Sequence, residues 1–254
     1  MFEQVYGSWP AHERFILVSC DETYLNKYFP RFYKTFTDHW QLPIHVHVID
    51  PSAQTRVKLQ KLGISFTYCD TKEHNWASEV NRYRATTGTQ NPDAEVQQWL
   101  YECYCQCQRF VVLGTKMTPR QSVLVADVDA YAQHTPTKRE KKYLFDKTCF
   151  SRHSDRLMAT FCHFHPRDIG KIENLADVIT RQLKQFFVLG MDQTAIKQVF
   201  KHDKRISIMG ERWIRHFDIK NKDQLKRHRK TIIYHEKGQR GKHKPVEVTW
   251  TDIE

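Results

Sequence analysis

Short apolar runs alternate with longer amphipathic stretches through the first half of the chain. Residues Phe15 to Cys20 form one such run, which Asp21 closes, and its length predicts a buried parallel strand. The stretch before Gly63 has helical periodicity, and the glycine predicts its end. The elements predicted in this half are strands over 15–20, 43–49 and 64–69 and helices over 22–38 and 52–62.

The alternation continues after a polar interruption. Residues 70–94 are polar and contain glycine and proline, so we predict a long loop or lid there. A helix over 94–113, which Gly114 ends, precedes a buried strand over 121–126. The less regular second half contains predicted strands over 156–164, 206–209 and 231–234 and predicted helices over 171–187 and 192–201. Strands alternating with helices predict an α/β fold, with a mixed, mostly parallel sheet and helices on both faces.

Composition favours one domain over residues 1–254, because 254 residues with 40% hydrophobic content can bury one sizeable core. Residues 1–14 have no basic stretch followed by an apolar run, and no segment approaches the roughly 20 apolar residues of a membrane span. We therefore expect a soluble, unprocessed chain. The seven cysteines lack the spacing of a disulfide framework and predict free thiols in a reducing cytoplasm, the host's if the protein is viral.

The segment Asp127-Val128-Asp129 is the sharpest chemical feature. It follows a buried strand, at the end where ligands bind in open α/β sheets. In an extended segment both carboxylates project to one side while Val128 points into the core. Two carboxylates on one side suit a hard cation such as Mg²⁺ or Mn²⁺. The alternative is a strand end that carries two solvated acids.

A second feature begins at His235, which follows a predicted strand and precedes a basic loop with two glycines. The imidazole can serve as a third protein ligand to the cation. Gly238 and Gly241 allow backbone N–H groups to approach phosphate oxygens, and Lys242 or Lys244 can neutralise a leaving diphosphate. The alternative for each lysine is a solvated position in a basic tail.

Together these residues resemble the metal-dependent GT-A glycosyltransferases, which have a Rossmann-like fold. The nearer resemblance is to retaining enzymes of the glycogenin and lipopolysaccharide-galactosyltransferase type. Those enzymes have a nucleotide-binding first strand, a D-x-D segment and a late H-x-x-G-x-x-K segment. In this sequence the matching residues are His235 and Gly238. The position three residues after Gly238, where the pattern has lysine, is Gly241, and Lys242 follows it. The resemblance implies a nucleotide-sugar donor, by default a UDP-sugar, with Mn²⁺ or Mg²⁺ and retention of configuration.

The resemblance also assigns roles to individual residues. It implies that Asp127, Asp129 and His235 hold the metal, and that Asp192 and Gln193 lie beside the transferred sugar. The alternative role for Asp192 is to cap the N-terminus of a helix. Arg109 is implied to bind the donor, and its alternative is an exposed position on the surface of a helix. The first half, 1–130, is expected to bind the donor and 131–254 the acceptor. The donor-binding residues that the resemblance implies are Ser19, Cys20, Asp21, Tyr24, Arg109, Asp127, Gly238, Lys242 and Lys244.

Other histidines and cysteines are better explained as structural residues. Cys103 and Cys107 lie four residues apart in a predicted helix, and without a second ligand pair they are interpreted as buried thiols rather than a zinc site. Either His163 or His165 can face an acceptor pocket, although a hydrogen-bonded sheet histidine is the commoner case. His45 and His47 have the same spacing of two residues in a predicted strand, as His163 and His165 do.

Charge bears on the acceptor. The net charge of +11 and the pI near 9.3 favour an acidic partner, which nucleic acid, an anionic membrane and a nucleotide diphosphate all satisfy. Between Lys220 and Lys244 ten lysines or arginines stand against two acidic residues. We therefore expect the acceptor to be duplex DNA with hydroxymethylated pyrimidines, as phage-type DNA glycosyltransferases modify. The second candidate acceptor is a saccharide at a membrane surface. The rival classes are a metal-dependent nucleotidyltransferase or nuclease and a nucleic-acid-binding module without catalysis.

Overall fold

Strands and helices alternate through the residues that the computed structural model describes, which are 4–153, 156–185, 190–210, 213–216, 231–235 and 247–253. The strands are β1 (Tyr6–Gly7), β2 (Arg14–Asp21), β3 (Ile44–Ile49), β4 (Ser65–Cys69), β5 (Ser122–Ala126), β6 (Ala130–Ala132), β7 (Cys149–His153), β8 (Arg156–Phe164), β9 (Ser207–Met209), β10 (Ile214–His216) and β11 (Ile233–His235). The helices are α1 (Glu22–Trp40), α2 (Ala53–Lys61), α3 (Trp76–Thr87), α4 (Asp93–Lys116), α5 (Lys138–Asp146), α6 (Ile169–Gln185) and α7 (Met191–Phe200), with 3₁₀ turns at Pro166–Asp168 and Trp250–Asp252.

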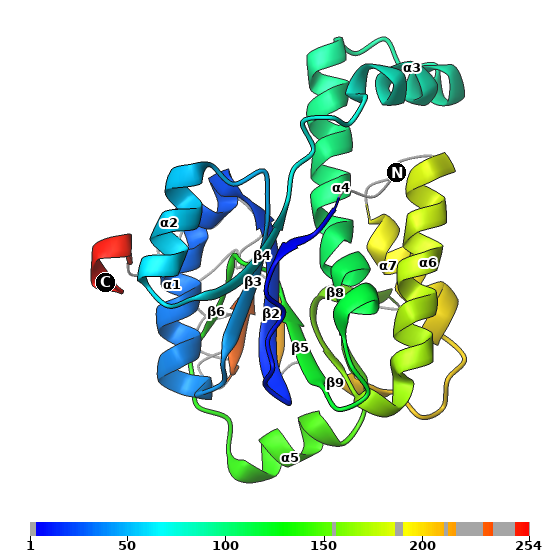
Figure 1. Cartoon of the computed structure of the whole chain (residues 1–254). Helices are drawn as coiled ribbons and strands as arrows, with labels where there is room; N and C mark the ends of the chain where they lie inside the picture. Colours follow the sequence, from blue (N-terminus) through cyan, green and yellow to red (C-terminus); the bar gives the residue numbers. More distant parts are fainter. Residues whose placement is uncertain are drawn as a thin grey trace, which may run out of the picture.

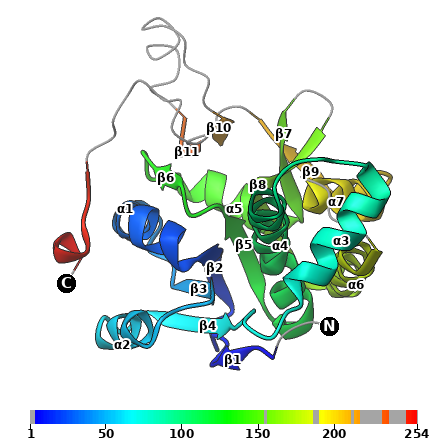
Figure 2. The ribbon, with the colours of Figure 1, turned by 90° about the horizontal axis from the view of Figure 1, so that it is seen from above.

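Within these ranges, eight strands form the main sheet in the order β1-β4-β3-β2-β5-β8-β7-β9, and β10-β11-β6 form a second sheet. The central strands β4, β3, β2 and β5 are parallel to one another, whereas β8 runs antiparallel to β5. Helices α1 and α2 cover one face of the main sheet, and α4, α6 and α7 cover the other (Figures 1 and 2). The predicted α/β fold with a mixed, mostly parallel sheet is confirmed.

Strand β2 explains why its sequence is continuously apolar. Phe15 and Leu17 pack into the core beneath α4, α6 and α7, whereas Ile16 and Val18 pack into the core beneath α1. Because successive side chains point to opposite faces and both faces are covered by helices, Phe15 to Val18 are all fully buried. No helix in the described ranges is both long and apolar enough to span a bilayer.

The predicted loop over residues 70–94 is wrong, because this segment contains α3 and the start of α4. Helix α3 buries little apolar surface, with Val80 as its one fully buried residue in the described chain, so it has no clear apolar stripe. Its ends carry capping signals nonetheless. Asn75 accepts the N–H of Ser78 at 3.0 Å, and Gly88 closes the helix with a φ of 68°.

The predicted end of the next helix at Gly114 is also wrong, because α4 continues to Lys116. The glycine is required instead by the close approach of α4 to α6. A Cβ at this position would lie 2.5 Å from the Cβ of Ala176 and 2.8 Å from the carbonyl oxygen of Ile172. A glycine that permits close packing and a glycine that ends a helix look alike in a sequence.

Four elements between residues 130 and 216 were missing from the sequence-based prediction: β6, α5, β7 and β10. Helix α5 had a readable signal, because Thr137 and Glu140 form a reciprocal capping box at its start. The strands are short and two of them lie outside the main sheet, so their patterns carry little periodicity.

Candidate active site

The carboxyl ends of β2 and β5 meet at the edge of the main sheet away from α5 (Figure 1). Val18 pairs with Ala126, the last residue of β5, so the end of β2, residues 19–21, extends alongside the segment that follows β5. The chain passes from β2 to β3 on one side and returns to β5 on the other. In open α/β sheets such a reversal of strand order marks the ligand-binding crevice.

The segment Asp127-Val128-Asp129 forms the turn between β5 and β6. The N–H of Asp127 donates to the Thr160 carbonyl at 2.9 Å, and its own carbonyl accepts the N–H of Ala130 at 3.1 Å. The extended conformation that we predicted for this segment is therefore wrong. The predicted core position of Val128 holds, because Val128 is 4% exposed whereas both aspartates are half-buried.

Arg109 links residues from three elements. Its side chain, 7% exposed, extends from α4 and forms ion pairs with Asp127 and, at 2.8 Å, with Asp192. Asp192 lies in the first turn of α7, where its Oδ1 accepts the N–H of Gln193 at 2.7 Å; Gly190 is the N-cap. One guanidinium thus faces two carboxylates in a buried setting, and the excess negative charge there favours a further cation. The surface alternative for Arg109 is wrong.

The end of β2 belongs to the same site as the turn after β5. Asp21 caps α1, accepting the N–H of Tyr24 at 2.7 Å, and the buried hydroxyl of Ser19 has no hydrogen-bond partner among the described residues. Burial raises the pKa of the Cys20 thiol, and the charges of Asp21 and Asp129 raise it further. Burial is also the main cause that raises the pKa of Tyr24, with a contribution from Asp129. Asp129 therefore lies within electrostatic range of both side chains.

Strand β11 brings the backbone of His235 next to this turn. His235 pairs with Ala130 of β6, the residue that follows Asp129. Its side chain lies outside the described part of the chain, as do the predicted diphosphate ligands Gly238, Lys242 and Lys244. In the residues that are described, no group of three His, Cys, Asp or Glu side chains is arranged to hold a metal ion. The three-ligand metal site stays a prediction that depends on His235.

The sequence matches no protein-family model and no curated protein. The structure is similar to that of the glycosyltransferase GlyE of Streptococcus pneumoniae TIGR4, with a TM-score of 0.56 and 15% identity over 94% of this chain. It is also similar to mouse xyloside xylosyltransferase 1, with a TM-score of 0.51 and 10% identity over 90% of this chain and 99% of that one. The galactosyltransferase LgtC is similar too, with a TM-score of 0.51 and 12% identity over 89% of this chain and 87% of that one. The chain has the fold of these glycosyltransferases. It spans 60% of the length of GlyE.

Asp50 lies at the same edge of the sheet as the carboxyl ends of β2 and β5, and the sequence-based prediction missed this residue. It follows β3 with a φ of 53° and accepts hydrogen bonds from the Thr71 hydroxyl at 2.7 Å and the Tyr101 hydroxyl at 3.1 Å. Burial raises the pKa of Asp21, and Glu102 and Asp50 contribute to that shift. A signal was available, because Asp50 lies directly after a buried strand as Asp127 does.

The buried His163 and the cysteine pair Cys103 and Cys107 are structural. His163 is fully buried in β8, hydrogen-bonded to the Ser122 hydroxyl at 2.6 Å and to the Lys147 carbonyl at 2.7 Å. Burial lowers the pKa of His163 to about 3, so the ring is neutral. Its Nδ1 donates to the carbonyl, and its Nε2 therefore accepts from the serine hydroxyl. The commoner interpretation, a hydrogen-bonded sheet histidine, is confirmed. Cys103 and Cys107 are buried thiols in the core, also as predicted.

Proposed function

We propose that the protein is a glycosyltransferase that transfers a sugar from a nucleotide-sugar donor, by default a UDP-sugar, to a hydroxyl group. The observation that carries this proposal is the position of Asp127 and Asp129, directly after the central strand β5 of a glycosyltransferase-type sheet. Support comes from Arg109 and the end of β2, which converge on the same edge. We assign residues 1–130 to donor binding and 131–254 to acceptor binding.

The side chains at this edge suit a hard divalent cation, Mn²⁺ or Mg²⁺. Asp127 and Asp129 offer carboxylate oxygens from a single turn. The guanidinium of Arg109 faces two carboxylates, those of Asp127 and Asp192, which leaves an excess of negative charge. We assign Asp127, Asp129 and His235 as the protein ligands. When bound, the cation supplies Lewis-acid stabilisation of the charge that develops on the departing diphosphate.

The chain's own residues position the donor. Arg109 holds the carboxylates of Asp127 and Asp192 in place, and we assign Asp192 and Gln193, at the start of α7, to contacts with the transferred sugar. The configuration at the anomeric carbon is retained, as in the enzymes that the sequence resembles. The remaining donor contacts are assigned to Ser19, Cys20, Asp21 and Tyr24 for the nucleoside and to Gly238, Lys242 and Lys244 for the diphosphate.

For the acceptor we propose a hydroxymethylated pyrimidine in duplex DNA. The segment 220–244 carries ten lysines or arginines against two acidic residues, and it includes β11, whose His235 pairs with Ala130, the residue after Asp129. A basic segment suits a phosphate backbone. The target base must leave the stack to reach the donor. A saccharide at a membrane surface is the second candidate, because the same charge suits anionic lipid headgroups.

Donor hydrolysis with and without Mn²⁺ tests the site. The wild type is expected to release UDP from at least one UDP-sugar in a metal-dependent way. Asp127→Asn and Asp129→Asn should each lower turnover by roughly 10²- to 10³-fold, the scale of losing one main electrostatic stabiliser. Asp38→Asn, on the exposed surface of α1, is the matched control. If either site variant retains more than half the activity with unchanged metal dependence, the assignment is wrong.

Assays of nucleotide transfer, strand cleavage and DNA binding with the same variants separate the rival classes. Nucleotide transfer or strand cleavage that needs the same aspartates would indicate a nucleotidyltransferase or nuclease. DNA binding without turnover of any donor would indicate a binding module. In both cases the proposed glycosyltransferase activity is rejected.

A mass measurement identifies the acceptor. DNA containing hydroxymethylcytosine or hydroxymethyluracil is incubated with the enzyme and a panel of UDP-sugars, then digested to nucleosides. A hexose- or pentose-sized gain on the modified base, absent from unmodified DNA, is the expected result. Transfer to a saccharide or lipid-linked acceptor without any gain on DNA would replace DNA by the membrane-surface candidate.

A further inference from the structure

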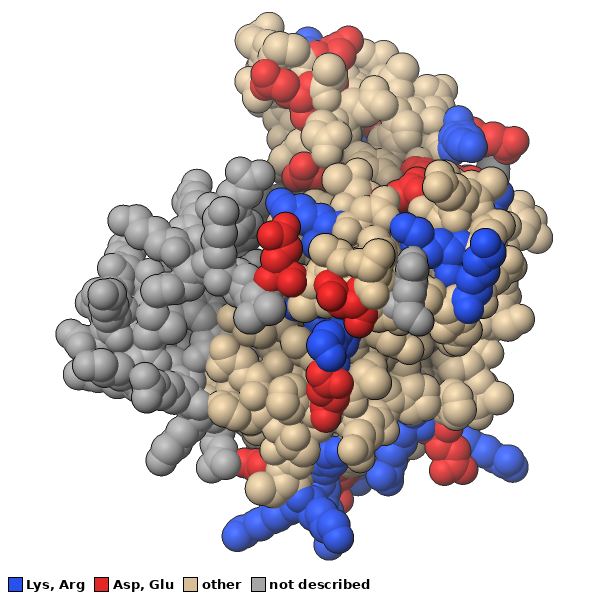
Figure 3. All heavy atoms as spheres, turned by 90° about the vertical axis from the view of Figure 1, so that its left-hand side faces the viewer, with Lys and Arg blue, Asp and Glu red and all other residues tan. Residues whose placement is uncertain are grey.

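A basic cavity lies at the opposite edge of the sheet from the candidate active site. It has a volume of about 360 Å³ and is lined by Arg14, Lys138, Lys141, Lys142, Phe145 and Asp146. Arg14 begins β2, and the other lining residues come from α5, which lies below the sheet in Figure 1. Lysine and arginine side chains also gather along the lower edge of the face shown in Figure 3.

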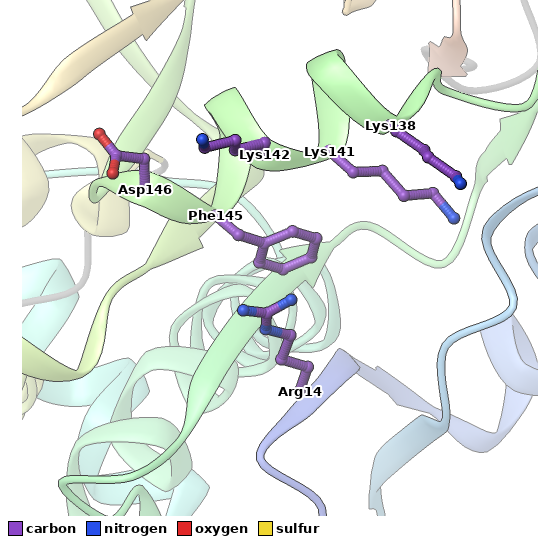
Figure 4. Close-up of a pocket in the computed structure, with 6 residues that line it drawn as sticks. All are labelled: Arg14, Lys138, Lys141, Lys142, Phe145 and Asp146. Atoms are coloured by element: carbon purple, nitrogen blue, oxygen red, sulfur yellow. The ribbon is translucent and has the colours of Figure 1, made fainter.

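The floor of this cavity is built from well-packed groups. The ring of Phe145 packs edge-on against His163, with ring centroids 4.9 Å apart, and His163 is held in turn by Ser122 and Lys147. The guanidinium of Arg14 lies 5.3 Å from the centre of the Phe145 ring (Figure 4). A cation held over an aromatic face is ordered before any ligand arrives.

The charges that line the cavity are poorly balanced. Lys138, Lys141 and Lys142 share one face of α5, because helical residues three and four apart are neighbours. Lys138 and Lys141 extend on the same side of the Phe145 ring in Figure 4. Lys141 donates to the Trp40 carbonyl at 2.8 Å. In the described chain none of the four lining cations forms an ion pair, and Asp146 is the one lining acid.

Geometry separates this cavity from the donor site. Strand β2 starts at Arg14 and ends at Asp21, eight residues that span roughly 23 Å at the usual rise of a strand. A donor bound near Asp21 therefore leaves the cavity free. The occupant must also be compact, because the cations line a cavity rather than an extended groove.

We propose that this cavity is a second anion site, which takes a compact phosphate-bearing group such as a diphosphate or a phosphomonoester. Four cations against one lining acid raise the local potential, and a multiply charged phosphate relieves it through several charge-assisted hydrogen bonds. The group can belong to a free metabolite or to a lipid headgroup. The proposal is independent of the catalytic assignment.

Calorimetric titration with pyrophosphate in EDTA tests the proposal, since chelation removes the cation on which diphosphate binding at the active site is expected to depend. The wild type is expected to bind. Arg14→Gln/Lys138→Gln should bind about tenfold more weakly or worse, because two charge-assisted contacts are lost. The matched control is Arg120→Gln/Arg139→Gln, which removes two exposed charges that do not line the cavity and should change affinity less than twofold. Thermal melts verify that all variants fold.

Binding to lipid vesicles distinguishes the two sources of the phosphate group, a free metabolite and a lipid headgroup. Co-sedimentation with phosphatidylcholine vesicles that contain phosphatidic acid, lost in the cavity variant and kept in the control, identifies a lipid headgroup. Pyrophosphate binding without vesicle binding identifies a free ligand. The proposal is overturned if wild type binds neither probe, or if the cavity and control variants behave alike. It is also overturned if a short DNA duplex is bound through these residues while pyrophosphate is not, which would indicate a nucleic-acid surface.

Discussion

Replacing Gly114 by alanine tests the packing that positions Arg109. The added methyl would lie 2.5 Å from the Cβ of Ala176 and 2.8 Å from the Ile172 carbonyl oxygen, where carbon atoms normally keep about 3.5–4.0 Å. Helices α4 and α6 must separate by roughly 1 Å, and overpacking of this kind costs about 3 kcal/mol. The higher helix propensity of alanine returns about 1 kcal/mol. The expected net loss is about 2 kcal/mol, or about 5 °C in Tm for a chain of this size.

The matched control is Gly170→Ala in α6, where an added Cβ meets nothing within 4 Å. This variant should be neutral or more stable by up to about 1 kcal/mol. Thermal melts and urea titrations measure both changes. Because Arg109 lies five residues before Gly114 on α4, the displacement should also lower donor turnover in the first variant and leave the second unaffected. Equal stability of the two variants would refute the close helix contact.

Three further outcomes are expected. His235→Ala should raise the Mn²⁺ concentration for half-maximal activity by about tenfold or more, and an unchanged titration would make His235 structural. Arg109→Lys should lower turnover at least roughly tenfold, because one ammonium cannot hold two carboxylates as a guanidinium does; wild-type turnover would contradict this. Burial lowers the pKa of His45 and of His47 from 6.5 to about 3, so both are neutral when folded. Their contribution to stability is complete above about pH 6.5 and is lost as the pH falls toward 3, by up to about 1.4 kcal/mol per histidine and pH unit. In thermal melts, the Tm of His47→Gln should therefore fall less steeply with decreasing pH than that of the wild type. An identical dependence of Tm on pH would contradict the assignment.

The aspartates of the candidate site were predictable because each ends or follows a buried strand. Asp21 and Asp127 come after apolar runs, and the parallel sheet places the ends of such runs at one edge. The missed residue, Asp50, has the same signal. By contrast, the conformation at Asp129 was not predictable, because the turn forms through a hydrogen bond between Ala130 and Asp127 that an alternating pattern does not reveal.

Apart from α3, α5, β1, β6, β7 and β10, the sequence by itself determined the succession of strands and helices and the elements that carry the candidate chemistry. These depend on periodicity and on capping within a few residues, which a short window contains. Tertiary structure alone decided that Arg109 joins Asp127 to Asp192, two residues far apart in the chain, and that Gly114 is a point of helix contact rather than a helix end. The cavity between Arg14 and α5 was likewise decided by packing. Such contacts depend on how elements are placed against one another, and the same local pattern is compatible with many placements.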